Sequence, residues 1–116
     1  MLAGMDQMQV EVCQRLGVEA HPSEPHLKLG LALETLGQQP VNGLRHSPEG
    51  DTTGWYIWAG DELSSAEDFF DPVHVGHLTE LVPSLIPYLA LPPGWRFQLA
   101  HGHEDVWFDG SLLGTK

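Results

Sequence analysis

The sequence has a single cysteine, few basic residues and no long hydrophobic run. Cys13 has no partner for an internal disulfide, which fits a reducing compartment such as the cytosol. No apolar stretch is long enough to span a bilayer, and the first residues carry neither the basic cluster nor the hydrophobic segment of a signal peptide. We therefore expect a cytoplasmic protein that does not insert into a membrane.

Basic residues are scarce. The chain has 5 Lys and Arg against 16 Asp and Glu, which gives a formal net charge of −11. No Lys or Arg lies between Arg45 and Arg96, whereas eight carboxylates do. Such a surface repels the phosphates of nucleic acids and of anionic membranes, and it attracts a basic protein partner. The alternative is that the acidity serves only to keep the protein soluble.

The motifs of common enzyme classes are also missing. The sequence has no Gly-x-Ser-x-Gly nucleophile elbow and no glycine-rich phosphate loop with a lysine. Cys13 lies in an apolar helical pattern, so we interpret it as a buried core thiol and not as a nucleophile. We interpret the acidic loop as solvated; the alternative is general acid–base catalysis by the carboxylates of Asp61 and Glu67. The prediction is a protein that is not an enzyme.

Two groups of histidines have the residue types of metal ligands. His74 and His77 are one helical turn apart with Asp71 before them, a spacing that can hold Zn²⁺ or Fe²⁺. The pair lacks the glutamate of a metalloprotease helix, so the signal is weak. A second polar group consists of His101, His103 and Glu104. We predict no metal and no cofactor, and a metal-dependent enzyme built on His74, His77 and a carboxylate is the alternative.

The hydrophobic pattern predicts one α+β domain, an antiparallel sheet packed on one side by helices. The length of 116 residues is enough for a core without disulfide or metal. Predicted helices cover residues 5–16, 73–82 and 84–89, and predicted strands cover residues 27–33, 41–46, 55–59, 95–99 and 104–108. Residues 32–36 are equally consistent with the start of a helical turn. We expect residues 41–46 to pair with 55–59, and 95–99 with 104–108. The predicted core residues are Leu29, Leu31, Ile57, Leu78, Leu81, Ile86, Leu89, Phe97 and Val106.

Residues 54–71 are the most informative stretch. An aromatic strand opens and closes on glycine and leads into an acidic loop. Alternation places Trp55 and Ile57 on one face of the strand, and Tyr56 and Trp58 on the other. If that second face is open, its aromatic rings beside carboxylates have the composition of a protein interface; the alternative is that both faces are covered. The predicted partner-binding residues are Tyr56, Trp58, Asp61, Glu62, Glu67, Asp68 and Asp71.

Five segments together resemble the bacterial immunity-protein 33 domain family. They are PVNGLR (40–45), GWYIWAGDE (54–62), FDPVHV (70–75), PYLALPPGWRF (87–97) and EDVWFD (104–109). The likeness covers residues 27–113, and the predicted helix within residues 1–17 lies outside it, as a lineage-specific addition or a dimer element. The resemblance implies a cytosolic protein encoded beside a secreted polymorphic toxin, which it binds and neutralises. It supplies no catalytic residues. An adaptor or structural subunit with another protein partner is a further alternative.

Overall fold

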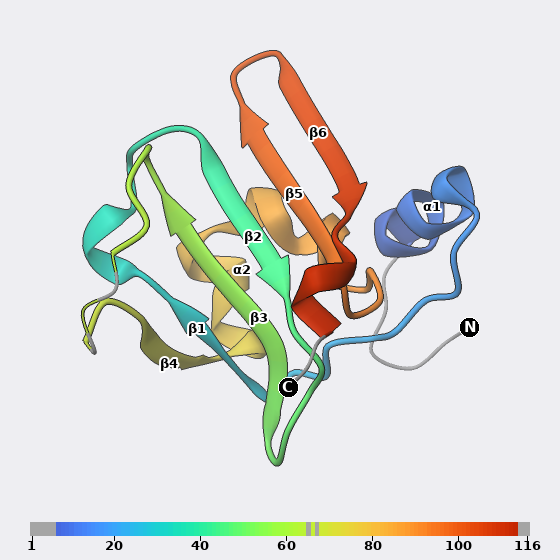
Figure 1. Ribbon diagram of the computed structural model, residues 1–116, viewed down its shortest axis with the longest axis horizontal. Helices are drawn as coiled ribbons and strands as arrows, with labels where there is room; N and C mark the ends of the chain where they lie inside the picture. The colour runs from blue at the N-terminus through green and yellow to red at the C-terminus, as the bar shows by residue number, and fades with distance from the viewer. Residues whose placement is uncertain (1–6, 65, 67, 114–116) are drawn as a thin grey trace.

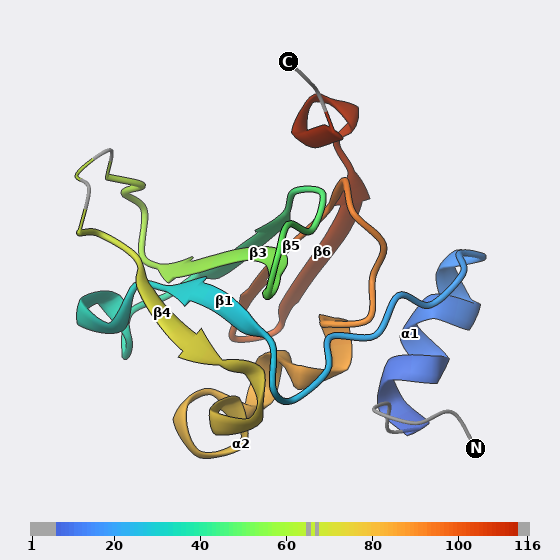
Figure 2. The ribbon, with the colours of Figure 1, turned by 90° about the horizontal axis from the view of Figure 1, so that it is seen from below.

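The computed structural model describes residues 7–64, 66 and 68–113. Within these residues, strands β1 to β6 form one sheet in the order β4-β1-β3-β2-β5-β6. Neighbouring strands are antiparallel except β1 and β3, which are parallel. Figures 1 and 2 show α1 and α2 on the same side of this sheet. The predicted α+β fold is therefore confirmed. The strands are β1 Lys28–Leu31, β2 Val41–Arg45, β3 Thr52–Ala59, β4 Asp71–His74, β5 Trp95–Ala100 and β6 His103–Phe108; the helices are α1 Gln7–Leu16 and α2 Leu78–Leu81, with 3-10 turns η1 Leu33–Thr35, η2 Val75–His77, η3 Pro83–Tyr88 and η4 Gly110–Leu113.

The aromatic strand β3 is the third of the six strands, as the sequence predicts. It forms the expected hairpin with β2, in which Ile57 lies opposite Gly43, and the expected pair of β5 with β6 is also present. Trp55 and Ile57 are fully buried on the face that the helices cover. The alternation of large apolar side chains along β3 therefore fixes which face of the sheet is the core.

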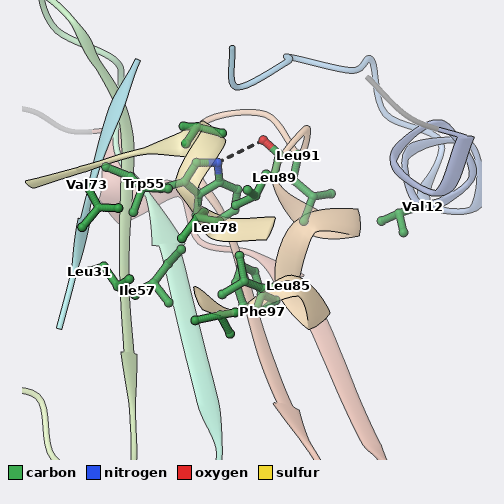
Figure 3. Close-up of a cluster of buried hydrophobic side chains, with 13 residues drawn as sticks. Val12, Leu31, Trp55, Ile57, Val73, Leu78, Leu85, Leu89, Leu91 and Phe97 are labelled. Atoms are coloured by element: carbon green, nitrogen blue, oxygen red, sulfur yellow. Dashed lines mark hydrogen bonds between the residues drawn. The ribbon is translucent and has the colours of Figure 1, made fainter. Parts of the chain in front are cut away.

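The main core lies between the sheet and the helical segments after β4 (Figure 3). The Trp55 indole nitrogen donates a hydrogen bond to the carbonyl of Leu89 at 3.1 Å, so the largest buried side chain also has its polar atom satisfied. The Phe97 ring lies across β2, where a Cβ atom at residue 43 would come within 2.4 Å of it. Gly43 is therefore required by the packing of Phe97.

The predicted core residues are buried or partly buried, with one exception. Leu81 is 44% exposed, so its assignment to the core was wrong. The reason is that α2 is only one turn long and directs Leu78, not Leu81, into the core.

The predicted helix from residue 73 begins later than expected. Residues Asp71–His74 form the edge strand β4, and Val73 lies opposite Leu29 of β1. The Val75 amide continues this contact by donating to the Leu27 carbonyl at 2.8 Å. Pro72 has no amide hydrogen and is tolerated because β4 is an edge strand. Pairing with β1 therefore replaces the first turn of the predicted helix.

The helix α1 packs through part of the apolar stripe that its helical spacing indicates, Met5, Met8, Val12 and Leu16. Val12 is buried in the main core and Leu16 packs against it; Met5 lies outside the described residues, and Met8 is 58% exposed. Gln9 is buried in its place, because its side-chain amide donates to the Ile86 carbonyl at 2.8 Å. Cys13 is buried as predicted, and desolvation raises the pKa of its thiol.

Two side chains connect α1 and η3 to the edge strand β6 through Glu104. Arg15 donates two hydrogen bonds to its carboxylate, at 2.9 and 3.2 Å, and the Tyr88 hydroxyl donates a third. These bonds, from Arg15 first and then Tyr88, hold the pKa of Glu104 below its usual range. Burial and the nearby carboxylate raise the pKa of Tyr88 to about 12, so its hydroxyl remains a donor at neutral pH.

This contact should make the docking of α1 depend on pH. The pKa of Glu104 is lower in the folded protein than in the unfolded chain. The ionised carboxylate therefore stabilises the fold at pH values above its pKa in the unfolded chain, and this contribution is lost as the pH falls through its pKa in the folded protein. We expect Glu104→Gln to be less stable than wild type at pH 7, by about 1 kcal/mol or less because the pair is exposed, with the difference shrinking below pH 4. Thermal unfolding from pH 7 to 3 measures this. The control Glu80→Gln should unfold like wild type, and a difference for Glu104→Gln that persists at pH 3 would contradict the assignment.

Candidate protein-interaction site

The second face of the sheet, opposite the helices, is only partly covered. Figure 2 shows the described residues of the segment that follows β3 and the C-terminal turn η4 projecting from this side, away from α2. Phe69 and Phe70 from the segment, and Leu112 from η4, pack against the side chains of Leu44 and Trp58. Trp58 is therefore buried, with 6% of its surface exposed. We call this side the open face.

Tyr56 is the large aromatic residue of β3 that stays accessible, with 39% of its surface exposed. Its ring makes edge-to-face contacts with Phe70 at 5.2 Å and with His46 at 5.5 Å between centroids. It also lies across β1, where a Cβ atom at Gly30 would come within 2.8 Å of the ring. An exposed ring that is already held in place loses little entropy on binding, which is typical of interface hot spots. The structure therefore separates the two predicted anchors: Tyr56 is accessible, whereas Trp58 is buried against Phe70.

Two of the hollows at the open face adjoin each other. The larger, which we call the open-face groove, has a volume of ≈ 470 Å³. The smaller has ≈ 250 Å³ and is lined in part by Asp61, Arg96 and Trp107. Trp58 and Leu63 line both. The lining of the open-face groove consists of Leu44, His46, Ser47, Glu49, Thr52, Gly54, Tyr56, Trp58, Leu63 and Phe70.

One of the predicted carboxylates, Asp61, lies beside these hollows. Asp61, Glu62 and Asp68 are exposed in the segment that follows β3, and Asp61 lines the smaller hollow. Asp71 begins β4 and is half-buried, and Glu67 lies outside the described residues. The fold therefore brings part of the acidic loop to the same face as Tyr56.

Each Lys and Arg among the described residues has a partner other than the predicted carboxylates. Arg15 pairs with Glu104, Lys28 with Asp51 at 3.3 Å, and Arg96 with Asp109 at 3.1 Å. Arg45 is buried among backbone carbonyls. Within the described ranges, Asp61, Glu62, Asp68 and Asp71 consequently have no Lys or Arg within ion-pair distance. Their negative charge is left for solvent or for a partner.

Several residues of the open face were not among the predicted site residues. His46 and Glu49 from the β2–β3 hairpin line the open-face groove, and Arg96 stacks against Trp107 beside the smaller hollow, 5.4 Å from the ring centroid. The predicted hairpin was a usable signal for the first two, because it places residues 46–54 next to the aromatic strand. Leu63 had no such signal, since its position depends on how the loop folds back.

The candidate metal ligands form no metal site in the described part of the chain. The rings of His74 and His77 lie edge to face with centroids 5.7 Å apart. His103 is near Asp105, with 3.8 Å between nitrogen and oxygen, and Glu104 is engaged by Arg15 and Tyr88. Across the described ranges, no three His, Cys, Asp or Glu side chains are grouped closely enough to hold a metal ion. Nor does any helix there have the length and apolar character needed to cross a membrane.

Comparison with known families gives one match. A family model described as an Imm33-like domain matches residues 8–109, from the second residue of α1 to the residue after β6. No curated protein and no solved structure matches the chain. The match includes the whole sheet and therefore both hollows of the open face.

Proposed function

Because the chain belongs to the immunity-protein 33 family, with an Imm33-like domain over residues 8–109, we propose that it binds and neutralises a bacterial toxin in the cytoplasm without catalysing a reaction. We place the binding surface on the open face because of the residues that this face presents. It combines a fixed, accessible aromatic ring with carboxylates that no described cation neutralises.

In this proposal the acidic segment after β3 meets a basic surface of the toxin. Asp61, Glu62 and Asp68 are exposed and unpaired among the described residues, so approaching cations experience an attraction that this chain does not cancel. Carboxylates at the rim of such an interface mainly accelerate association. One that becomes desolvated opposite Arg or Lys contributes more, and its truncation costs roughly 2–5 kcal/mol.

Tyr56 supplies the centre of the proposed interface. It lines the groove, whereas the exposed carboxylates Asp61, Glu62 and Asp68 lie on the segment that follows β3. An aromatic anchor surrounded by charged residues follows the usual division between interface core and rim. Trp58, buried against Phe70, keeps this arrangement rigid from below.

The test uses the purified chain and the toxin encoded beside its gene. We expect a one-to-one complex and protection of cells that express the toxin. The association rate should fall about tenfold or more between 50 and 500 mM salt, because charge steering is screened beyond ~8 Å at physiological ionic strength. Stopped-flow association and a growth assay measure these effects. No binding and no protection would refute the function; tight binding with a salt-independent rate would refute only the role of the acidic segment.

A further inference from the structure

The open-face groove is walled by connected aromatic rings. Phe70 contacts Tyr56 and Trp58 edge to face, with centroids 5.2 and 6.3 Å apart, and the His46 ring contacts Tyr56 at 5.5 Å. The volume of ≈ 470 Å³ is within the range of pockets that bury a ligand-sized group. Aromatic faces carry a negative quadrupole and attract cations within about 6 Å. The walls therefore suit either an apolar side chain or a cation.

The polar groups of the groove favour the cation. Its lining includes the carboxylate of Glu49 and contains no Lys or Arg. His46 Nδ1 lies 3.1 Å from the Leu112 carbonyl oxygen, which can only accept, so Nδ1 carries the proton. In the neutral ring Nε2 is then an acceptor. The groove thus offers a carboxylate, the His46 imidazole and aromatic ring faces within a chain of net charge −11.

Building on the proposed toxin binding, we propose that the open-face groove is a socket for one arginine side chain of the toxin. The guanidinium stacks on the ring of Tyr56 and donates to the carboxylate of Glu49, while its aliphatic part lies against Leu44 and Leu63. A planar guanidinium combines stacking with bidentate donation to a carboxylate, which an ammonium group cannot do. The rings need no rearrangement to receive it, because Phe70, His46 and Gly30 already hold Tyr56 in place.

A peptide probe tests the socket without the toxin. Acetyl-Gly-Arg-Gly-amide is titrated into the ¹⁵N-labelled chain and compared with the citrulline peptide, which has the same shape without charge, and with the norleucine peptide, which is apolar. We expect the arginine peptide to shift amide signals of residues 44–56, with a dissociation constant of millimolar order, and the other two to bind at least tenfold more weakly. Equal or tighter binding of the norleucine peptide would show an apolar socket and overturn the proposal, as would the absence of shifts with the arginine peptide.

Variants of the chain connect the socket to the toxin. Tyr56→Leu and Glu49→Gln should each weaken both arginine-peptide binding and toxin affinity, the latter roughly ten- to a hundredfold for Tyr56→Leu. Leu81→Ala and Glu80→Gln alter exposed residues of α2 and should stay within about twofold of wild type. If Tyr56→Leu and Glu49→Gln bind the toxin like wild type, the socket proposal fails while the proposed function stands. If wild type does not bind the toxin, the proposed function fails, and the peptide titration still decides whether the groove selects arginine.

Discussion

Replacing Asp61, Glu62 and Asp68 together by Lys is expected to abolish protection of toxin-expressing cells and to weaken toxin binding by about a hundredfold or more. Each replacement removes one negative charge and adds one positive charge, so the formal net charge changes from −11 to −5. The attraction toward a basic partner then becomes local repulsion, and like charges brought together at an interface cost several kcal/mol. All three residues are exposed and outside the sheet, so urea unfolding should show stability close to that of wild type.

The control is a second triple variant with the same change in net charge. Glu11, Glu19 and Glu80 are exposed, and they lie on α1, just after it, and on α2. Their replacement by Lys should slow association slightly through the net charge but leave the affinity within about threefold of wild type. An equal loss of affinity in both triple variants would mean that only the overall charge matters. Full protection by the Asp61, Glu62 and Asp68 variant would place the contact elsewhere.

The sequence pattern was sufficient to predict the two faces of β3, because alternation is a local property of a strand. It left open whether the second face is covered, and the structure shows why. Phe70 and Leu112 reach Trp58 from segments whose positions depend on how the chain folds back over the sheet. Tyr56, two residues earlier, remains accessible. The composition of the candidate site was therefore predictable, whereas the difference between a buried Trp58 and an exposed Tyr56 was not.

Non-local pairing also explains the error at β4. The apolar residues Val75, Leu78 and Val82 have a helical spacing, so a local pattern extends the helix back to residue 73. The strand exists because β1, whose residues precede their partners by 40 to 46 positions, offers an edge to Asp71–His74. Buried polar residues are hidden from sequence patterns in the same way. Gln9 is satisfied by a carbonyl 77 positions away, and no local signal distinguishes it from a surface residue.

Arg45 is the clearest case of a polar residue whose role only the fold reveals. It is 3% exposed, and its guanidinium donates to the carbonyls of Thr53 at 2.9 Å, His21 at 2.8 Å and Leu91 at 2.7 Å. It also lies 5.6 Å from the ring centroid of Trp55. Desolvation lowers the pKa of Arg45 to about 10, which is well above neutrality, so the side chain is charged in the folded protein. Arg45 thereby connects β3 to the segments around His21 and Leu91, which are not strands of the sheet.

Removal of this guanidinium should have the largest effect on stability. Arg45→Met preserves much of the apolar volume of the side chain but leaves buried carbonyls without their charged donor. An unsatisfied buried group costs about 1–3 kcal/mol. We therefore expect the free energy of unfolding to fall by about 3–5 kcal/mol in total. Arg45→Lys should not restore stability, because one ammonium group cannot reproduce the rigid fork that reaches three segments. Urea unfolding measures both variants. Arg96→Met, on the neighbouring strand β5 with a partly exposed partner in Asp109, is the matched control and should cost about 1 kcal/mol. An Arg45→Met variant as stable as the control would show that the segments around His21 and Leu91 are held by the apolar core alone.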